Sequence, residues 1–119
     1  MDRMTEYSLY AISFLSNKKN FYLSFYSKKE ITPKRFYNLI DKIVSKCLND
    51  DFVGAIHHAT NHELILIDEN EFYDLTCYKA EIDFDNRVVE IDYGFVAQVN
   101  IKFEKFHETG HELVEKYWG

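Results

Sequence analysis

The stretch 78-YKAEIDFDNRVVEIDY-93 decides the fold of this chain. Two alternating runs of apolar and polar residues meet at Asp85-Asn86, and this pattern predicts a β-hairpin closed by a tight turn. If these two residues are the loop, apolar residues face one another across the strands: Ile82 and Val89, Ala80 and Ile91, Tyr78 and Tyr93. We expect this face of the hairpin to pack against a core.

The other face of the same hairpin is acidic. Its cross-strand pairs are Glu81 with Glu90, Asp83 with Val88, and Lys79 with Asp92. Like charges that face each other across two strands lower stability. This face is therefore either a solvated surface that tolerates a small cost or a surface that receives a basic partner.

Size and composition predict one compact domain over residues 1–119. A chain of 119 residues buries about two-thirds of its unfolded surface, and one proline and four glycines leave little sequence for long linkers. The N-terminal segment lacks a signal-peptide pattern, and no apolar stretch approaches the ~20 residues of a membrane span. We expect a cytoplasmic protein without membrane contact, in which Cys47 and Cys77 are reduced thiols.

The charges are unevenly distributed along the chain. Residues 1–49 carry nine lysines and arginines against four acids, whereas residues 63–92 carry ten acids against Lys79 and Arg87. These acids are Glu63, Asp68, Glu69, Glu71, Asp74, Glu81, Asp83, Asp85, Glu90 and Asp92. An acidic surface repels phosphate backbones and attracts basic proteins. Direct nucleic-acid binding is therefore not expected of the middle of the chain.

The first half of the chain contains one clear helix signal. Residues 7–15 fit either a buried strand or a short helix, and a hairpin with residues 21–26 is preferred. Thr32-Pro33 provides an N-cap followed by proline, which predicts a helix over about 33–48. Its apolar stripe includes Phe36, Leu39, Ile40, Ile43, Val44, Cys47 and Leu48, and the opposite side carries Lys34, Arg35, Asp41, Lys42 and Lys46. We interpret that charged side as the solvated face of an amphipathic helix.

The second half is richer in strand patterns. Residues 52–59, 63–68 and 72–75 precede the hairpin, Gly94 is expected in a turn or bulge, and residues 95–106 alternate as a half-buried strand. Thr109 to Glu112 form a capping box that predicts a short C-terminal helix over about 110–118. The predicted fold class is α+β: a mostly antiparallel twisted sheet packed against the 33–48 helix.

Residues 107–111 (HETGH) match the H-E-x-x-H pattern. They resemble zinc proteases over these five residues, where the two histidines lie one helical turn apart and the glutamate is the general base. If Thr109 caps a helix that begins after it, His107 lies outside that helix and cannot share a face with His111. The two interpretations exclude each other, and a small zinc-dependent hydrolase using His107, Glu108 and His111 is the alternative function.

Three further histidines, His57, His58 and His62, suggest a second metal site. On a strand, adjacent histidines point to opposite faces, so His57 and His58 cannot both bind one ion without a bend. A pair of His58 and His62 across a turn stays possible. We nevertheless expect ordinary histidines, no metal and no other cofactor.

Catalytic motifs are otherwise lacking in the sequence. It contains no Gly-rich phosphate loop, no G-x-S-x-G elbow and no C-x-x-C pair, and acidic residues are too numerous to single out an acid and base pair. We therefore expect a binding protein and not an enzyme. A nucleic-acid-binding regulator that uses the basic N-terminal half is a third hypothesis, for which the nine tyrosines and ten phenylalanines could stack on bases.

In its general character, the small acidic aromatic-rich α+β chain resembles bacterial immunity proteins of the contact-dependent growth inhibition type. The resemblance extends over the whole chain and includes no diagnostic motif. It implies a tight complex with a cognate toxin domain, often a basic nuclease. The residues expected to bind this partner are Glu81, Asp83, Glu90 and Asp92, extended by Asp68, Glu69, Glu71 and Asp74.

Overall fold

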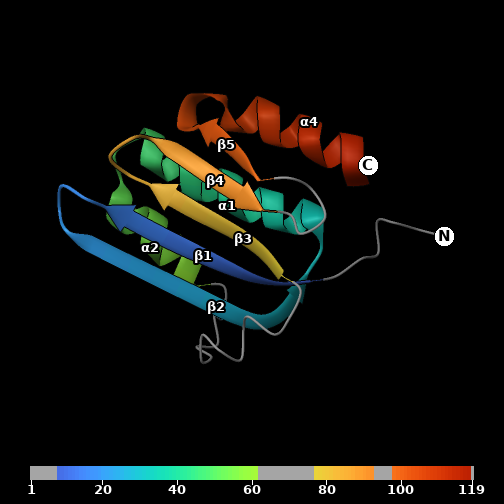
Figure 1. Ribbon diagram of the computed structural model, residues 1–119, viewed down its shortest axis with the longest axis horizontal. Coiled ribbons are helices and arrows are strands. Elements are labelled where there is room, and N and C mark those ends of the chain that lie inside the picture. The colour runs from blue at the N-terminus through green and yellow to red at the C-terminus, as the bar shows by residue number, and fades with distance from the viewer. Residues whose placement is uncertain (1–7, 62–76, 93–97, 119) are drawn as a thin grey trace.

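The structure is a computed structural model that describes residues 8–61, 77–92 and 98–118. In chain order, its elements are β1 (Ser8–Ser16), β2 (Phe21–Ile31), α1 (Pro33–Leu48), α2 (Phe52–Thr60), β3 (Cys77–Asp83), β4 (Val88–Asp92), β5 (Val99–Lys102), the 3₁₀ turn η2 (Phe103–Lys105) and α4 (Phe106–Trp118). Figure 1 shows the strands as one sheet with α1 and α2 against the same face. The α+β class is confirmed.

The sheet of the described residues has the order β2-β1-β3-β4-β5. The first hairpin, β1 with β2, is confirmed, and so is the antiparallel pairing of β3 with β4. These two hairpins are joined by a parallel pairing of β1 with β3, which the sequence did not indicate. β1 and β3 each pair with a neighbouring strand along both edges. The core lies between these two strands and α1.

The helix α1 begins and ends where the sequence predicts. The Thr32 hydroxyl accepts a hydrogen bond from the backbone N–H of Arg35 at 3.2 Å, and Pro33 is the first helical residue. Residues of its apolar stripe are buried, including Phe36, Ile40 and Ile43, each with no exposed surface. Cys47 is a free thiol on the same stripe, fully buried as expected.

The central hairpin has the predicted register but a longer loop. Glu81 pairs with Glu90, and Asp83 pairs with Val88, so the connection includes Phe84 and Arg87 and not only Asp85-Asn86. Phe84 is 7% exposed because it packs into the core against the ring of Phe52, with a centroid distance of 4.6 Å. The predicted two-residue turn is therefore wrong, because the connection between β3 and β4 runs from Phe84 to Arg87.

Residues 52–59, interpreted as part of a strand for the histidine geometry, form the helix α2 instead. The carboxylate of Asp51 caps it by accepting a hydrogen bond from the N–H of Gly54 at 2.9 Å. Ala55 and Ala59 are buried one helical turn apart, which is the helical spacing of a short apolar stripe. Because alanine is only weakly hydrophobic, these two residues do not give the sequence a clear helical pattern of apolar positions.

The end of the chain also differs from its prediction. The strand expected over 95–106 is β5 up to Lys102, and the helix expected over 110–118 begins at Phe106. Phe103 and Phe106 are both buried, at 1% and 0% exposure. The two residues are three positions apart, which is a helical spacing, whereas a continued strand would bury every second residue. The chain accordingly forms η2 and α4 here and not a longer strand. The prediction that Thr109 caps this helix is wrong, because α4 begins before it, at Phe106.

Several expectations lie outside the described residues: the runs 63–68 and 72–75, the role of Gly94, and the first residues of the strand predicted from 95. Among the helices that the structure describes, none has the length and apolarity needed to cross a bilayer.

Candidate functional site

The face of the sheet opposite α1 and α2 carries the acidic residues of the hairpin. We call it the outer face. It has a hollow of about 160 Å³ over strands β1 to β4. Its lining residues are Ala11, Ser13, Tyr22, Ser24, Tyr26, Lys79, Ala80, Glu81, Glu90, Asp92 and Gln98. Figure 1 shows that no labelled helix lies in front of this face.

Glu81 and Glu90 are the centre of the outer face. They face each other across β3 and β4, as predicted, and both line the hollow. Partial burial raises the pKa of Glu81, and the negative charges of Glu90 and Asp83 raise it further. The ionised form of Glu81 is therefore less favourable here than in water, and a cation placed between the two carboxylates would remove that disadvantage.

Asp83 has a structural role that the sequence did not predict. Its Oδ1 accepts hydrogen bonds from the backbone N–H groups of Asp85 and Asn86, both at 3.0 Å, and its Oδ2 accepts one from the Asn86 side chain at 2.8 Å. The carboxylate thus organises the hairpin loop. Of the other residues expected to bind a partner, Asp92 pairs with Lys79, whereas Asp68, Glu69, Glu71 and Asp74 lie outside the described residues.

The first hairpin adds hydroxyl and aromatic groups to the outer face. The Ser13 and Ser24 hydroxyl oxygens are 2.9 Å apart, and the Tyr22 hydroxyl donates to the Ser13 Oγ at 3.3 Å. Tyr22 remains 58% exposed. Sequence reasoning missed these residues because only the parallel register, which pairs Ser13 with Glu81, brings them beside the acids. The sequence does indicate that Tyr22, Ser24 and Tyr26 share one face of a strand, because they are two positions apart.

The H-E-x-x-H residues do lie on one helix. Because α4 begins at Phe106, His107 and His111 are one helical turn apart. Each ring has a different partner, however: His107 Nδ1 lies 3.3 Å from both carboxylate oxygens of Asp41, and His111 Nε2 lies 3.1 Å from the Glu115 carboxylate. In residues 8–61, 77–92 and 98–118, no group of three histidines, cysteines or acids is placed to hold a metal ion.

The other histidines belong to α2. His57 is exposed, and His58 is partly buried and faces a separate hollow beside α1. The strand geometry assumed for this pair is wrong, because both lie on a helix. His62, the expected companion of His58, lies outside the described residues.

Comparison of the chain with protein-family models, with curated proteins and with solved structures finds no match in any of the three.

Proposed function

We propose that this chain is an immunity protein that binds a basic toxin domain in the cytoplasm and blocks it through the outer face. The observation that carries the proposal is the Glu81 and Glu90 pair, held opposite each other in a hollow that exposed Tyr22 borders. The pair lowers the stability of the isolated chain. A lysine or arginine of a partner would turn this repulsion into two favourable contacts.

The surroundings of the pair also fit a protein partner. Tyrosine is favoured at protein interfaces because its ring contributes apolar area while its hydroxyl stays hydrogen-bonded. Tyr22 is a large side chain that is 58% exposed, and it lines the same hollow as Glu81 and Glu90. Charges would accelerate the encounter, and the aromatic contacts would set the lifetime of the complex.

The experiment requires a defined partner. Where the neighbouring gene encodes a secreted protein, its C-terminal domain, purified as a catalytically inactive variant, is the candidate. We compare the Glu81→Gln/Glu90→Gln chain with Glu108→Gln/Glu112→Gln, which removes two exposed acids of α4 with the same charge change. The association rate at low salt is expected to fall about tenfold in the first variant only, and the wild-type rate is expected to fall as salt is added.

Removal of the Glu81 and Glu90 repulsion is expected to stabilise the chain, and urea unfolding of the variant checks that a slower association does not come from loss of folding. Co-expression provides the second measurement: the wild-type chain should restore growth of cells that produce the active toxin domain, and the Glu81→Gln/Glu90→Gln chain should restore it less. Equal association rates for both variants, or a rate independent of salt, would reject the outer face as the binding surface.

A second candidate, a zinc-dependent hydrolase, is favoured by one observation, the placement of His107 and His111 one turn apart on α4. Zinc bound through Nε2 of both rings would have to displace Glu115 from His111, whereas Asp41 could stay on Nδ1 of His107. Metal analysis of untagged protein grown with zinc tests this function. Stoichiometric zinc that disappears in a His107→Ala/His111→Ala variant supports it, and zinc far below one ion per chain rejects it.

A further inference from the structure

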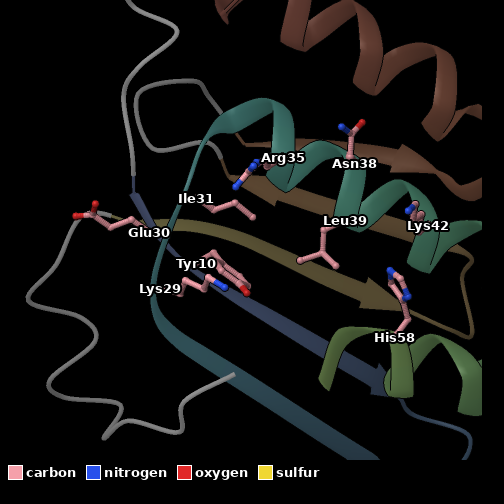
Figure 2. Close-up of a pocket in the computed structure, with 9 residues that line it drawn as sticks. All are labelled: Tyr10, Lys29, Glu30, Ile31, Arg35, Asn38, Leu39, Lys42 and His58. Atoms are coloured by element: carbon pink, nitrogen blue, oxygen red, sulfur yellow. The ribbon is translucent and has the colours of Figure 1, made fainter. Parts of the chain in front are cut away.

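A second hollow, of about 300 Å³, lies on the helix side of the sheet. We call it the basic pocket. Its walls come from three places in the fold, as Figure 2 shows: the ends of β1 and β2, two turns of α1, and α2. The volume is within the range of small-molecule binding sites. The pocket is separate from the outer face, because Tyr10 lines the former while its neighbour Ala11 lines the latter.

Four basic side chains line the basic pocket: Lys29, Arg35, Lys42 and His58. In the part of the chain that the structure describes, Arg35 and Lys42 have no ion-pair partner. Glu30 is the one carboxylate among the lining residues, and in Figure 2 its side chain extends away from the bases. The pocket therefore concentrates positive charge although the whole chain has a net charge of −6.

Tyr10 provides an independent indication of a ligand. Its side chain is 2% exposed and it lines the pocket, where Figure 2 shows its hydroxyl end directed toward the space between α1 and α2. Among the described residues, this hydroxyl has no hydrogen-bond partner. A buried hydroxyl without a partner is costly, whereas a ligand oxygen in the pocket would accept its hydrogen bond.

The apolar part of the lining distinguishes between classes of ligand. Ile31 and Leu39 lie between the bases, so a bound molecule would contact hydrocarbon as well as charge. An inorganic anion would leave that surface uncovered. A nucleic-acid strand would need a basic groove that follows its backbone, which a single local hollow of about 300 Å³ does not provide.

We propose that the basic pocket binds a small organic phosphate, whose phosphate accepts hydrogen bonds from Arg35, Lys42 and the Tyr10 hydroxyl while its organic part contacts Ile31 and Leu39. A phosphomonoester carries between one and two negative charges at neutral pH, and arginine binds phosphate through two parallel hydrogen bonds. This site is independent of the toxin-binding function proposed for the outer face.

Isothermal titration calorimetry tests the proposal with three probes: adenosine 5′-monophosphate, glucose 6-phosphate and inorganic phosphate. Adenosine and glucose are the uncharged references. We expect at least one of the organic phosphates to bind saturably and more tightly than both inorganic phosphate and its own reference. The Arg35→Gln/Lys42→Gln variant should lose about tenfold or more in affinity, because hydrogen bonds to charged groups contribute most to such sites.

The control variant is Lys34→Gln/Lys46→Gln, which removes two cations from the same helix that do not line the pocket. It should keep the wild-type affinity. Equal losses in both variants, binding of inorganic phosphate alone, or no saturable binding of any probe would overturn the proposal. Tighter binding of a short oligonucleotide that also depends on Arg35 and Lys42 would overturn it in favour of nucleic acid.

Tyr10→Phe separates a role in binding from a role in folding. The substitution removes only the hydroxyl, so the buried ring keeps its contact with Phe36 at a centroid distance of 6.0 Å. We expect unfolding at the same or higher denaturant concentration and an affinity for the organic phosphate about fivefold weaker. Unchanged affinity would remove Tyr10 from the proposed site.

Discussion

Gly110 allows α4 to lie close to α1. A Cβ atom at this position would lie 2.8 Å from Cδ1 of Tyr37. The Tyr37 ring cannot retreat easily, because it stacks on Phe106 at 5.7 Å and its hydroxyl donates to the His107 carbonyl at 2.7 Å. Glycine is therefore required at position 110 because of tertiary packing. The local sequence does not indicate this requirement, since a glycine inside a helix only weakens the helix prediction.

We expect Gly110→Ala to lower the free energy of unfolding by about 1–3 kcal/mol, the usual cost of overpacking. Alanine is the better helix former by ~1 kcal/mol, so an increase in stability would show that the Tyr37 ring adjusts freely. Urea unfolding measures the difference. A Glu112→Ala variant, at an exposed position of the same helix, controls for the general effect of adding alanine.

Glu81 gives a pH-dependent prediction. Its pKa is raised in the folded chain by burial and by the charges of Glu90 and Asp83. A carboxyl with a raised folded pKa contributes its full stability below the unfolded pKa and loses it as the pH rises through the folded pKa. Glu81→Gln is therefore expected to raise the free energy of unfolding at neutral pH by about 0.2–1 kcal/mol.

The gain in the free energy of unfolding from Glu81→Gln should shrink as the pH falls below the ordinary pKa of a glutamate, because the wild-type carboxyl is then protonated in both the folded and the unfolded chain. Urea unfolding at several pH values measures it. The exposed Glu112→Gln is the matched control. A gain that stayed constant down to low pH would mean that packing, and not charge, is responsible.

At the scale of elements, the two most regular signals in the sequence predicted their structures with the right boundaries or register. Helix α1 has a cap, a proline and an uninterrupted apolar stripe, and all three indicate the same helix. The β3 and β4 strands alternate cleanly, so a register shifted by one residue would expose Ile82 and Val89. The predicted C-terminal helix is present as α4, but prediction failed at α2 and at the start of α4. Two buried alanines and two buried phenylalanines in these places acquire their meaning only from the packed neighbours.

The two cap signals can be compared directly. Thr32 accepts a hydrogen bond from the Arg35 N–H, whereas Thr109 lies inside α4. We expect Thr32→Ala to lower the free energy of unfolding by about 1 kcal/mol, and Thr109→Ala to change it by less than about 0.5 kcal/mol. Thermal unfolding of both variants measures this contrast. A comparable loss for Thr109→Ala would restore the later helix start and would place His107 outside the helix.

The loop of the central hairpin depends on Asp83. Its carboxylate accepts three hydrogen bonds from Asp85 and Asn86, two of them from backbone N–H groups. Asp83→Ala would leave these donors to solvent, and we expect a loss of about 1–3 kcal/mol in the free energy of unfolding. Asp83→Asn should lose less, because its amide oxygen can still accept from the backbone. Chemical denaturation of the two variants tests the order.

The same result bears on the proposed binding surface. If Asp83→Ala unfolds more easily, a binding defect in that variant cannot be assigned to lost contact with a partner. This is why Glu81 and Glu90 carry the test of the outer face. A stability equal to that of the wild-type chain would instead leave Asp83 available as a contact residue.

For the whole molecule, the sheet separates two surfaces of opposite charge. The alternation of β1 places Tyr10 toward the basic pocket and Ala11 toward the acidic outer face. The sequence indicated the charge asymmetry and the acidic pair, since both follow from local patterns. It could not indicate the basic pocket or the hydroxyls of the outer face, because these depend on how β1, α1 and α2 come together across long sequence separations.

Cys47 provides a probe of the whole fold. It is fully buried beneath the sheet, and burial raises the pKa of its thiol to about 12. Since the thiolate is the reactive form, a thiol reagent at neutral pH should modify Cys47 only when the chain opens. In a Cys77→Ser variant, we expect labelling of Cys47 to follow global unfolding and to accelerate in urea in proportion to the unfolded fraction.

Labelling of Cys47 also reports whether a ligand of the basic pocket stabilises the fold, although the thiol itself does not line that pocket. A ligand that binds only the native state slows opening by the factor 1 + [L]/Kd, about a hundredfold at a hundred times Kd. An organic phosphate that binds by calorimetry should slow labelling by this factor in the Cys77→Ser chain, and much less after Arg35→Gln/Lys42→Gln at the same concentration. Rapid labelling without denaturant would contradict the burial of Cys47. Slow labelling that the phosphate leaves unchanged would show that Cys47 is exposed by a local opening at the C-terminal end of α1, which leaves the turns that line the basic pocket in place.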